Sequence, residues 1–424
     1  MNATSPPTTF TRRMVAGNIA ALFSGSAVSQ GMTALALLLT ARQLGVIGYG
    51  QYSSSIALAS MTAIVFNLGM DIWLLREGAH EPKHLGVYVG SVLSIKAIAG
   101  LVWFIVLALI SPWLNTITSS NSFPVPLVIL SAVVVWLDGV LFTLLTTFKA
   151  LLRNKYTSII DATSDFVWVL ATAALIGLGV RQAVPYMQAR AGVMIGTVAI
   201  AGILARRIER FKTDLQVTQR IIKETFPYAA SEFLAWTSMR VDILILATIS
   251  GEEAVGLYAP AVSLANALFL VPAAVYSVIL PVLSNLFGSH PRQAWLTAGR
   301  SLGLLVLLGA VLSVLLYMGS PLLVALLGSS FGGSLEILRI LSGNVFIHSL
   351  SFGMAAILVA VNQQARRTLV QAAAVGINVL ANLIVIPQFG IQGAAWVYVG
   401  TEIVLLAGYS ALVFQHWMRS RQST

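Results

Sequence analysis

Apolar residues run through this chain in long segments with few charges, and short, more polar connectors separate them. Twelve of these segments have about 20 residues or more, the length that an α-helix rising ~1.5 Å per residue needs to cross ~30 Å of hydrocarbon. Lipid offers no partner to backbone N–H and C=O groups, so each segment is predicted to be a helix. The pattern therefore predicts an all-α, polytopic membrane protein. Its predicted spans are 14–41, 47–75, 85–110, 125–148, 157–180, 183–205, 226–250, 255–282, 296–319, 335–360, 367–387 and 391–416.

The composition supports this class. Of the 424 residues, 57% are hydrophobic and 9% are charged, which is too little charge for the surface of a soluble domain of this size. The chain has no cysteine, so disulfides and thiolate chemistry are excluded.

Basic residues fall on alternate sides of the predicted spans. With the N-terminus placed in the cytoplasm, the inner connectors hold 19 of the 25 basic residues, and the outer connectors hold only Arg42 and Arg181. The positive-inside rule favours this orientation, with both termini cytoplasmic. The net charge of +10 is then explained by contact with anionic lipid headgroups, and we expect no nucleic-acid partner.

The chain divides into two halves that echo each other. A basic connector, 206–225, separates a predicted six-helix bundle at 1–205 from a second one at 226–424. Gly50-Gln51-Tyr52 in the first half matches Gly256-Leu257-Tyr258 in the second at an offset of 206. Lys155 and Gly179 match Arg366 and Gly390 at an offset of 211. Parallel repeats of this kind usually place a substrate site at their interface near the membrane midplane.

Three turn segments carry a resemblance to a known family. They are 41–52, with Gly45, Tyr49 and Tyr52; 251–261, with Gly256 and Tyr258; and 378–395, with Asn378, Asn382 and Pro387. In these segments and in its six-plus-six layout the chain resembles polysaccharide flippases of the Wzx type. That superfamily also contains MATE drug antiporters and lipid II flippases. The resemblance implies a lipid-linked oligosaccharide as substrate, and a polysaccharide polymerase with chain-length machinery as partners.

Polar residues inside the predicted spans are the candidates for function, because a charge at the centre of a span costs at least ~2.5–3.5 kcal/mol. A pyrophosphate that crosses the midplane needs cations there, and Lys96 and Arg240 lie deep in different halves. The predicted substrate-binding residues are Lys96, Arg240, Arg190, Asn378 and Asn382. The alternative for the two asparagines is that they only join helices by hydrogen bonds.

Five carboxylates complete the candidate set. Buried carboxylates can take up protons near neutral pH, which would couple transport to an ion gradient. The alternative is that each one neutralises a buried base. The predicted coupling or charge-pairing residues are Asp138, Asp165, Glu232, Asp242 and Glu402.

These observations favour a flippase that moves a polyprenyl-pyrophosphate-linked oligosaccharide across a bacterial-type plasma membrane, driven by an ion gradient or by the membrane potential. We expect no enzyme activity, no cofactor and no metal, because the sequence has no P-loop, no metal-ligand cluster and no large external loop. Three alternatives stay open: a MATE-like exporter of organic cations, a membrane glycosyltransferase or ligase, and a scaffold that transports nothing. If the protein were a MATE-like exporter, its cavity should be acidic and rich in aromatic residues.

Overall fold

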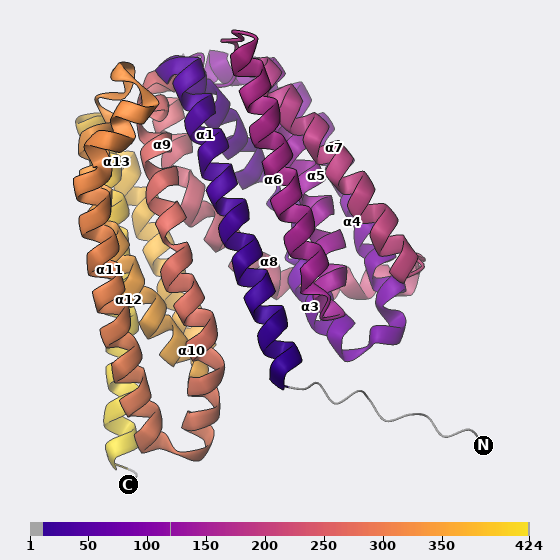
Figure 1. The fold of residues 1–424 in the computed structure, drawn as a ribbon, viewed down its shortest axis with the longest axis vertical. Helices are drawn as coiled ribbons and strands as arrows, with labels where there is room; N and C mark the ends of the chain where they lie inside the picture. Colours follow the sequence, from indigo (N-terminus) through magenta and orange to yellow (C-terminus); the bar gives the residue numbers. More distant parts are fainter. Residues whose placement is uncertain (1–11, 119, 423–424) are drawn as a thin grey trace.

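The structure, a computed structural model, describes residues 12–118 and 120–422, and these residues form helices without any strand (Figure 1). The prediction of an all-α fold is confirmed. The α-helices are α1 (Arg12–Thr62), α2 (Ile64–Asn67), α3 (Met70–His80), α4 (Leu85–Thr118), α5 (Val125–Ala150), α6 (Asn154–Gly177), α7 (Ala183–Ile208), α8 (Leu215–Ile249), α9 (Gly251–Leu268), α10 (Leu270–Ser289), α11 (Pro291–Leu327), α12 (Ser334–Ala360) and α13 (Gln364–Gln422). Short 3-10 turns lie at Pro82–His84 and Ser329–Phe331.

Within the described residues, nine helical segments are long and apolar enough to cross a membrane. Two of them hold two predicted spans each, because α1 bends at Gly45 and α13 bends at Gly390, where the backbone leaves helical geometry. Helix α8, which is more charged, contains the seventh predicted span. Each of the twelve predicted spans therefore corresponds to one or two helical segments of the structure.

Two predicted spans are broken rather than continuous. The second, 47–75, is interrupted at Leu68 and Gly69, which have positive φ angles of 47° and 66°. Only glycine fits at position 69, because a Cβ there would lie 2.6 Å from Tyr228 of α8. The eighth, 255–282, breaks at Phe269, where Pro272 has no N–H to donate to the preceding turn. Periodic hydropathy does not reveal such breaks, since the apolar pattern continues across them.

The repeat is visible in the backbone. Gly45 and Gly251, which are 206 residues apart, have φ angles of 69° and 81°. Gly179 and Gly390, which are 211 apart, have φ angles of 70° and 55°. Both members of each pair therefore have a positive φ at the corresponding place in the two halves, a backbone conformation that favours glycine.

The two halves meet at a reciprocal contact between Gly50 and Gly256. A Cβ on Gly50 would lie 1.8 Å from the carbonyl oxygen of Glu252, and a Cβ on Gly256 would lie 1.9 Å from that of Val46. Val46 and Glu252 are themselves 206 residues apart, so the contact is symmetric in the repeat. Backbones pack here without intervening side chains, and the halves are closed against each other.

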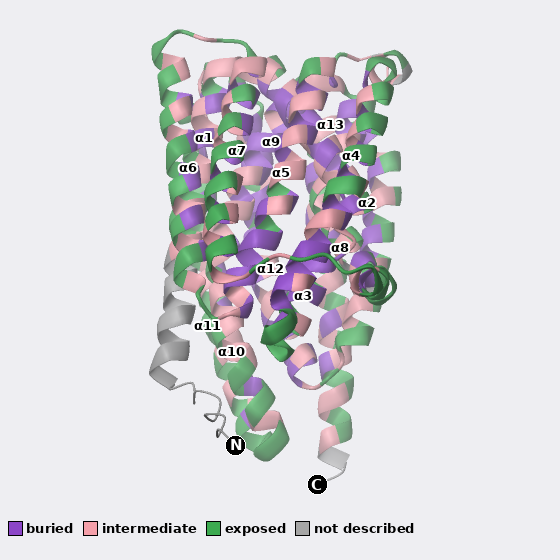
Figure 2. Ribbon diagram, turned by 90° about the vertical axis from the view of Figure 1, so that its right-hand side faces the viewer, coloured by how far each residue is buried: buried purple, intermediate pink, exposed green. Residues whose placement is uncertain are grey.

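Helices α9 to α13 lie on one side of the molecule and α3 to α7 on the other, with α1 between them (Figure 1). We call the end where α1 begins and α13 finishes the termini end; it is the lower end of Figures 1 and 2. The opposite end, with Gly45 and Gly50, is the distal end. Figure 2 shows exposed residues along the outer faces of the spans, as expected of helices that face lipid.

Candidate functional site

A central cavity of about 440 Å³ lies between α1, α8, α9, α10 and α12. It therefore combines α1 of the first half with helices of the second. Among the described residues that line it there is no carboxylate. Its polar lining residues are Gln30, Thr33, Arg240, Ser263, Asn266 and His348.

Arg240 is the one fixed cation among these lining residues. It is half-buried on α8 and makes no hydrogen bond or ion pair with any other residue that the structure describes. Asp242 attracts the charge of Arg240 without contacting it, and its oxygens accept hydrogen bonds from the hydroxyl of Tyr258 at 2.6 Å and the backbone N–H of Ile243 at 2.8 Å. Glu232 accepts a long hydrogen bond of 3.4 Å from Trp236. The guanidinium donors of Arg240 are thus left available to an anion in the cavity.

His348 lies at the edge of the same cavity. Its ring stacks on Phe269, with centroids 3.9 Å apart, and meets Phe352 edge-on at 4.8 Å. Its Nδ1 lies 3.0 Å from Oε2 of Glu402, although the geometry is not that of a hydrogen bond. Glu402 is buried and does not line the cavity. Glu402 therefore balances any positive charge that His348 carries, and Arg240 supplies the fixed positive charge of the lining.

Lys96 has a different environment. Its side chain is fully buried, and Nζ donates to Oδ2 of Asp71 at 2.6 Å and to the carbonyl of Gly139 at 2.8 Å. The other oxygen of Asp71 accepts a hydrogen bond from Thr143 at 2.7 Å. The pair joins α3, α4 and α5. Lys96 therefore does not reach the central cavity in this conformation.

A second, smaller cavity of about 110 Å³ lies beside this pair. Asp138 of α5 and Glu232 of α8 line it together with Asp71, Asn67 and Trp236. Asp138 is exposed into this space. Two of the predicted coupling carboxylates are therefore brought together, next to Lys96. Along α8, Glu232 faces the small cavity and Arg240 faces the central one.

Asp165 and Arg190 form an ion pair between α6 and α7. Nη1 of Arg190 lies 3.2 Å from Oδ1 of Asp165, and its guanidinium sits 4.1 Å from the ring centroid of Trp168. Ser29 of α1 donates a hydrogen bond to the other oxygen of Asp165. The pair is mostly buried, with side-chain exposures of 17% for Arg190 and 10% for Asp165.

Asn378 and Asn382 are buried within α13 and do not line the central cavity. Asn378 donates to Thr401 at 2.9 Å, and Asn382 donates to Asn378 at 3.1 Å. The bond from Asn378 to Thr401 connects the two parts of α13 across the bend at Gly390, and the bond from Asn382 lies within the first part.

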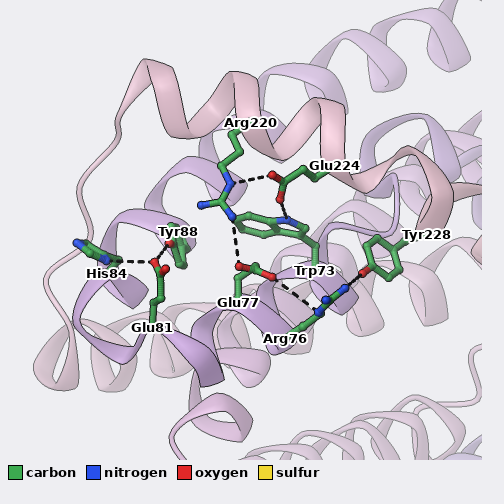
Figure 3. A network of polar contacts seen from close by, with 9 residues as sticks. All are labelled: Trp73, Arg76, Glu77, Glu81, His84, Tyr88, Arg220, Glu224 and Tyr228. Carbon is green, nitrogen blue, oxygen red and sulfur yellow. Dashed lines mark hydrogen bonds and ion pairs between the residues drawn. The ribbon is translucent and has the colours of Figure 1, made fainter.

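A polar network at the termini end attaches the start of α8 to α3 (Figure 3). Arg220 contacts Glu77 at 3.3 Å and Glu224 at 2.9 Å, and Glu224 also accepts from Trp73 at 2.8 Å. The hydrogen bonds from Arg220 and Trp73 lower the pKa of Glu224. The basic connector that precedes α8 also packs closely, since a Cβ on Gly90 would lie 2.2 Å from the carbonyl of Lys212. The connector is thus held against the first half.

The sequence did not single out Asn266, Phe269 or Met239, which also line the central cavity. Asn266 stands 206 residues after Ser60, a polar residue of the second predicted span, so the repeat could have identified it. Phe269 and Met239 carry no such signal, because apolar residues are common in every span.

The fold and the cavity define a class: a polytopic helical membrane protein with the fold of MOP-superfamily transporters. The chain is similar to the lipid II flippase MurJ in an inward closed conformation, with a TM-score of 0.76, 13% identity, and coverage of 92% of this chain and 87% of that one. It is also similar to the eukaryotic MATE transporter AtDTX14, with a TM-score of 0.71, 13% identity, and coverage of 95% and 96%. A third similar structure is a MOP-superfamily transporter from Pyrococcus furiosus, described as having a binding pocket of reverse polarity, with a TM-score of 0.66, 13% identity, and coverage of 95% of each chain.

The family follows from the sequence model that matches residues 15–287, described as polysaccharide biosynthesis protein. The match covers well over half of the chain, and the protein belongs to this family. A search of curated protein sequences found no match. The resemblance to polysaccharide flippases is confirmed at the level of the family.

Proposed function

We propose that this protein is a flippase that moves a polyprenyl-pyrophosphate-linked oligosaccharide across the plasma membrane, with both termini in the cytoplasm. The observation that carries the proposal is the central cavity, where Arg240 is unpaired and no described lining residue is a carboxylate. An unpaired guanidinium in a low-dielectric site attracts a phosphate strongly and can bind it through two parallel hydrogen bonds. Gln30, Ser263 and Asn266 supply hydrogen bonds for sugar hydroxyls. Family membership supports the substrate class.

The other predicted residues take different parts in this proposal. Asp138 and Glu232 share a cavity beside Lys96 and are the candidates for ion coupling, whereas Asp165 is paired with Arg190. Lys96 can reach a phosphate only if it releases Asp71. Asp242, Glu402, Asn378 and Asn382 are proposed to hold the helices around the cavity in place. A polymerase and chain-length proteins are the proposed partners at the membrane.

The rival function is export of organic cations. A cavity for cations needs acidic groups to offset the desolvation of the charge. The described lining of the central cavity offers an arginine and a histidine instead. The polarity of the cavity therefore favours an anionic substrate.

The test is transport by purified protein in lipid vesicles, with a fluorescent lipid-linked pyrophosphate sugar in one arm and ethidium in the other. Arg240→Ala is expected to reduce sugar-lipid transport by roughly 10- to 100-fold, the equivalent of a hydrogen bond to a charged group worth about 1.5–3 kcal/mol. Arg300→Ala, an exposed arginine of α11 that does not line the cavity, is the matched control and should transport as wild type does. Transport of ethidium but not of the sugar lipid would contradict the proposal.

A further inference from the structure

The outer face of the first half carries a third cavity, a groove of about 500 Å³ between α6 and α7. Its walls are almost wholly apolar, and none of its residues lines the central cavity. Ile159 is 54% exposed and Ile200 is 58% exposed. Apolar side chains that are exposed on a membrane span, away from the central cavity, face lipid.

Small residues make the groove. Gly192 and Gly196 lie on its α7 wall, and a Cβ on either glycine would meet no atom within 4 Å. On its floor the hydroxyl oxygen of Thr197 lies 3.0 Å from that of Ser164 and 2.9 Å from the carbonyl oxygen of Val193, so these polar groups have partners within the protein. The two helices spread apart toward the termini end (Figure 1).

The length of the groove matches one leaflet of a bilayer. It runs from Gly192 to Leu204 along α7, which is about 18 Å of helix, roughly half of the ~30 Å of hydrocarbon. Its lower limit lies near Ile159 of α6 and Leu204 of α7. An acyl chain that occupies a single leaflet fits this length.

Two cations stand just beyond that limit, one from each wall. Lys155 precedes Ile159 by four residues, and Arg207 follows Leu204 by three, so both continue the groove face of their helices toward the termini end. Both side chains are exposed, and neither makes an ion pair or hydrogen bond with any residue in the described part of the chain. By contrast, the adjacent Arg206 lies over the ring of Phe211.

We propose that the α6–α7 groove is a binding site for an anionic phospholipid of the leaflet at the termini end. One acyl chain fills the groove, and the phosphate lies between Lys155 and Arg207. Basic residues between membrane helices commonly bind anionic headgroups in this way. The inference is independent of the proposed transport function, because no residue of the groove lines the central cavity.

The test is a titration of the purified full-length protein with phosphatidylglycerol and, separately, with phosphatidylcholine, with bound lipid counted by native mass spectrometry. The wild type should prefer phosphatidylglycerol. Lys155→Gln and Arg207→Gln should each weaken phosphatidylglycerol binding by about fivefold and leave phosphatidylcholine unchanged. Gly196→Leu, which fills open space in the groove, should weaken binding of both lipids.

Matched controls are Arg206→Gln, which removes the neighbouring charge, and Ala199→Leu, which adds the same bulk at an exposed position of α7 outside the groove. Both should bind lipid as the wild type does.

Equal binding of the two lipids by the wild type overturns the proposal. So does the combination of a dimeric wild type with a monomeric Gly196→Leu variant that binds lipid normally, because the groove is then an interface between copies. If a polyprenyl phosphate binds at Lys155 and Arg207 and phosphatidylglycerol does not, the occupant is the substrate chain and the proposal is also wrong.

Discussion

Lys96 and Arg240 received the same predicted role from the sequence, as bases deep in membrane spans, and the structure gives them opposite surroundings. Lys96 is fully buried and is matched by Asp71 and the carbonyl of Gly139. Arg240 is half-buried, faces a cavity and makes no hydrogen bond or close ion pair with any described residue, although Asp242 attracts its charge from a distance. The difference shows that depth in the membrane does not by itself identify a functional charge. A buried charge with all its partners is part of the framework, whereas one that faces a cavity without partners is available to a ligand.

The largest expected effect comes from breaking the Lys96 pair. Lys96→Met should destabilise the protein by roughly 3–5 kcal/mol, because it leaves the carboxylate of Asp71 buried without its counter-charge. Thermal unfolding of the purified protein measures this. Lys96→Met combined with Asp71→Asn should recover most of the loss, and Arg240→Met alone should unfold close to wild type. If Arg240→Met were as destabilising as Lys96→Met, the distinction between the two bases would be lost.

The ion pair of Arg190 and Asp165 is an intermediate case. Arg190→Gln should cost about 1–2 kcal/mol, because it loses both the ion pair and the stacking on Trp168, while partial exposure lets water replace some of the interaction. The unfolding transition in detergent reports this effect. Arg181→Gln is a suitable control, since Arg181 is exposed in the connector before α7 and should change little. A loss as large as that of Lys96→Met would place Arg190 with the fully buried charges.

The smallest effect is expected at the termini end, where Arg220 and Glu224 are both about half exposed. Arg220→Gln should cost less than about 1 kcal/mol, as for other exposed pairs. The pKa of Glu224 lies below its ordinary value of 4.5, so its contribution to stability is present above pH 4.5 and is lost as the pH falls through the lowered pKa. The difference in melting temperature between wild type and Arg220→Gln should therefore be larger at pH 7 than at pH 3. A difference that grows on acidification would show that another group dominates.

Much of the fold was predictable because lipid imposes helices of a fixed length on apolar segments. The bends at Gly45 and Gly390 fall between predicted spans, and the repeat of 206 residues identified Gly50 and Gly256 as equivalent positions, although not that they touch. The break at Leu68 and Gly69 was not predictable, because it depends on the approach of Tyr228 from another helix.

The sequence predicted which charged residues lie inside the membrane spans, but not which side chains each of them contacts. The partner of Lys96 lies 25 residues away on α3, and that of Arg190 lies 25 residues away on α6. The rotation of each helix about its own axis decides such pairings, and packing between helices sets that rotation. The position of Arg240 in a cavity without acids follows in the same way from the faces that α1, α9 and α12 turn toward α8.

The central claim is that Arg240 makes the central cavity selective for anions. The chain has no cysteine, so Gln30→Cys places a single thiol in the cavity lining, and its reaction with an anionic and a cationic methanethiosulfonate reagent can be compared in detergent-solubilised protein. The rates are normalised to those of Asn121→Cys, an exposed position between α4 and α5. We predict that the anionic reagent is favoured in the cavity by about tenfold and that Arg240→Gln removes most of this preference. Preference for the cationic reagent, or a preference that survives Arg240→Gln, would contradict the account.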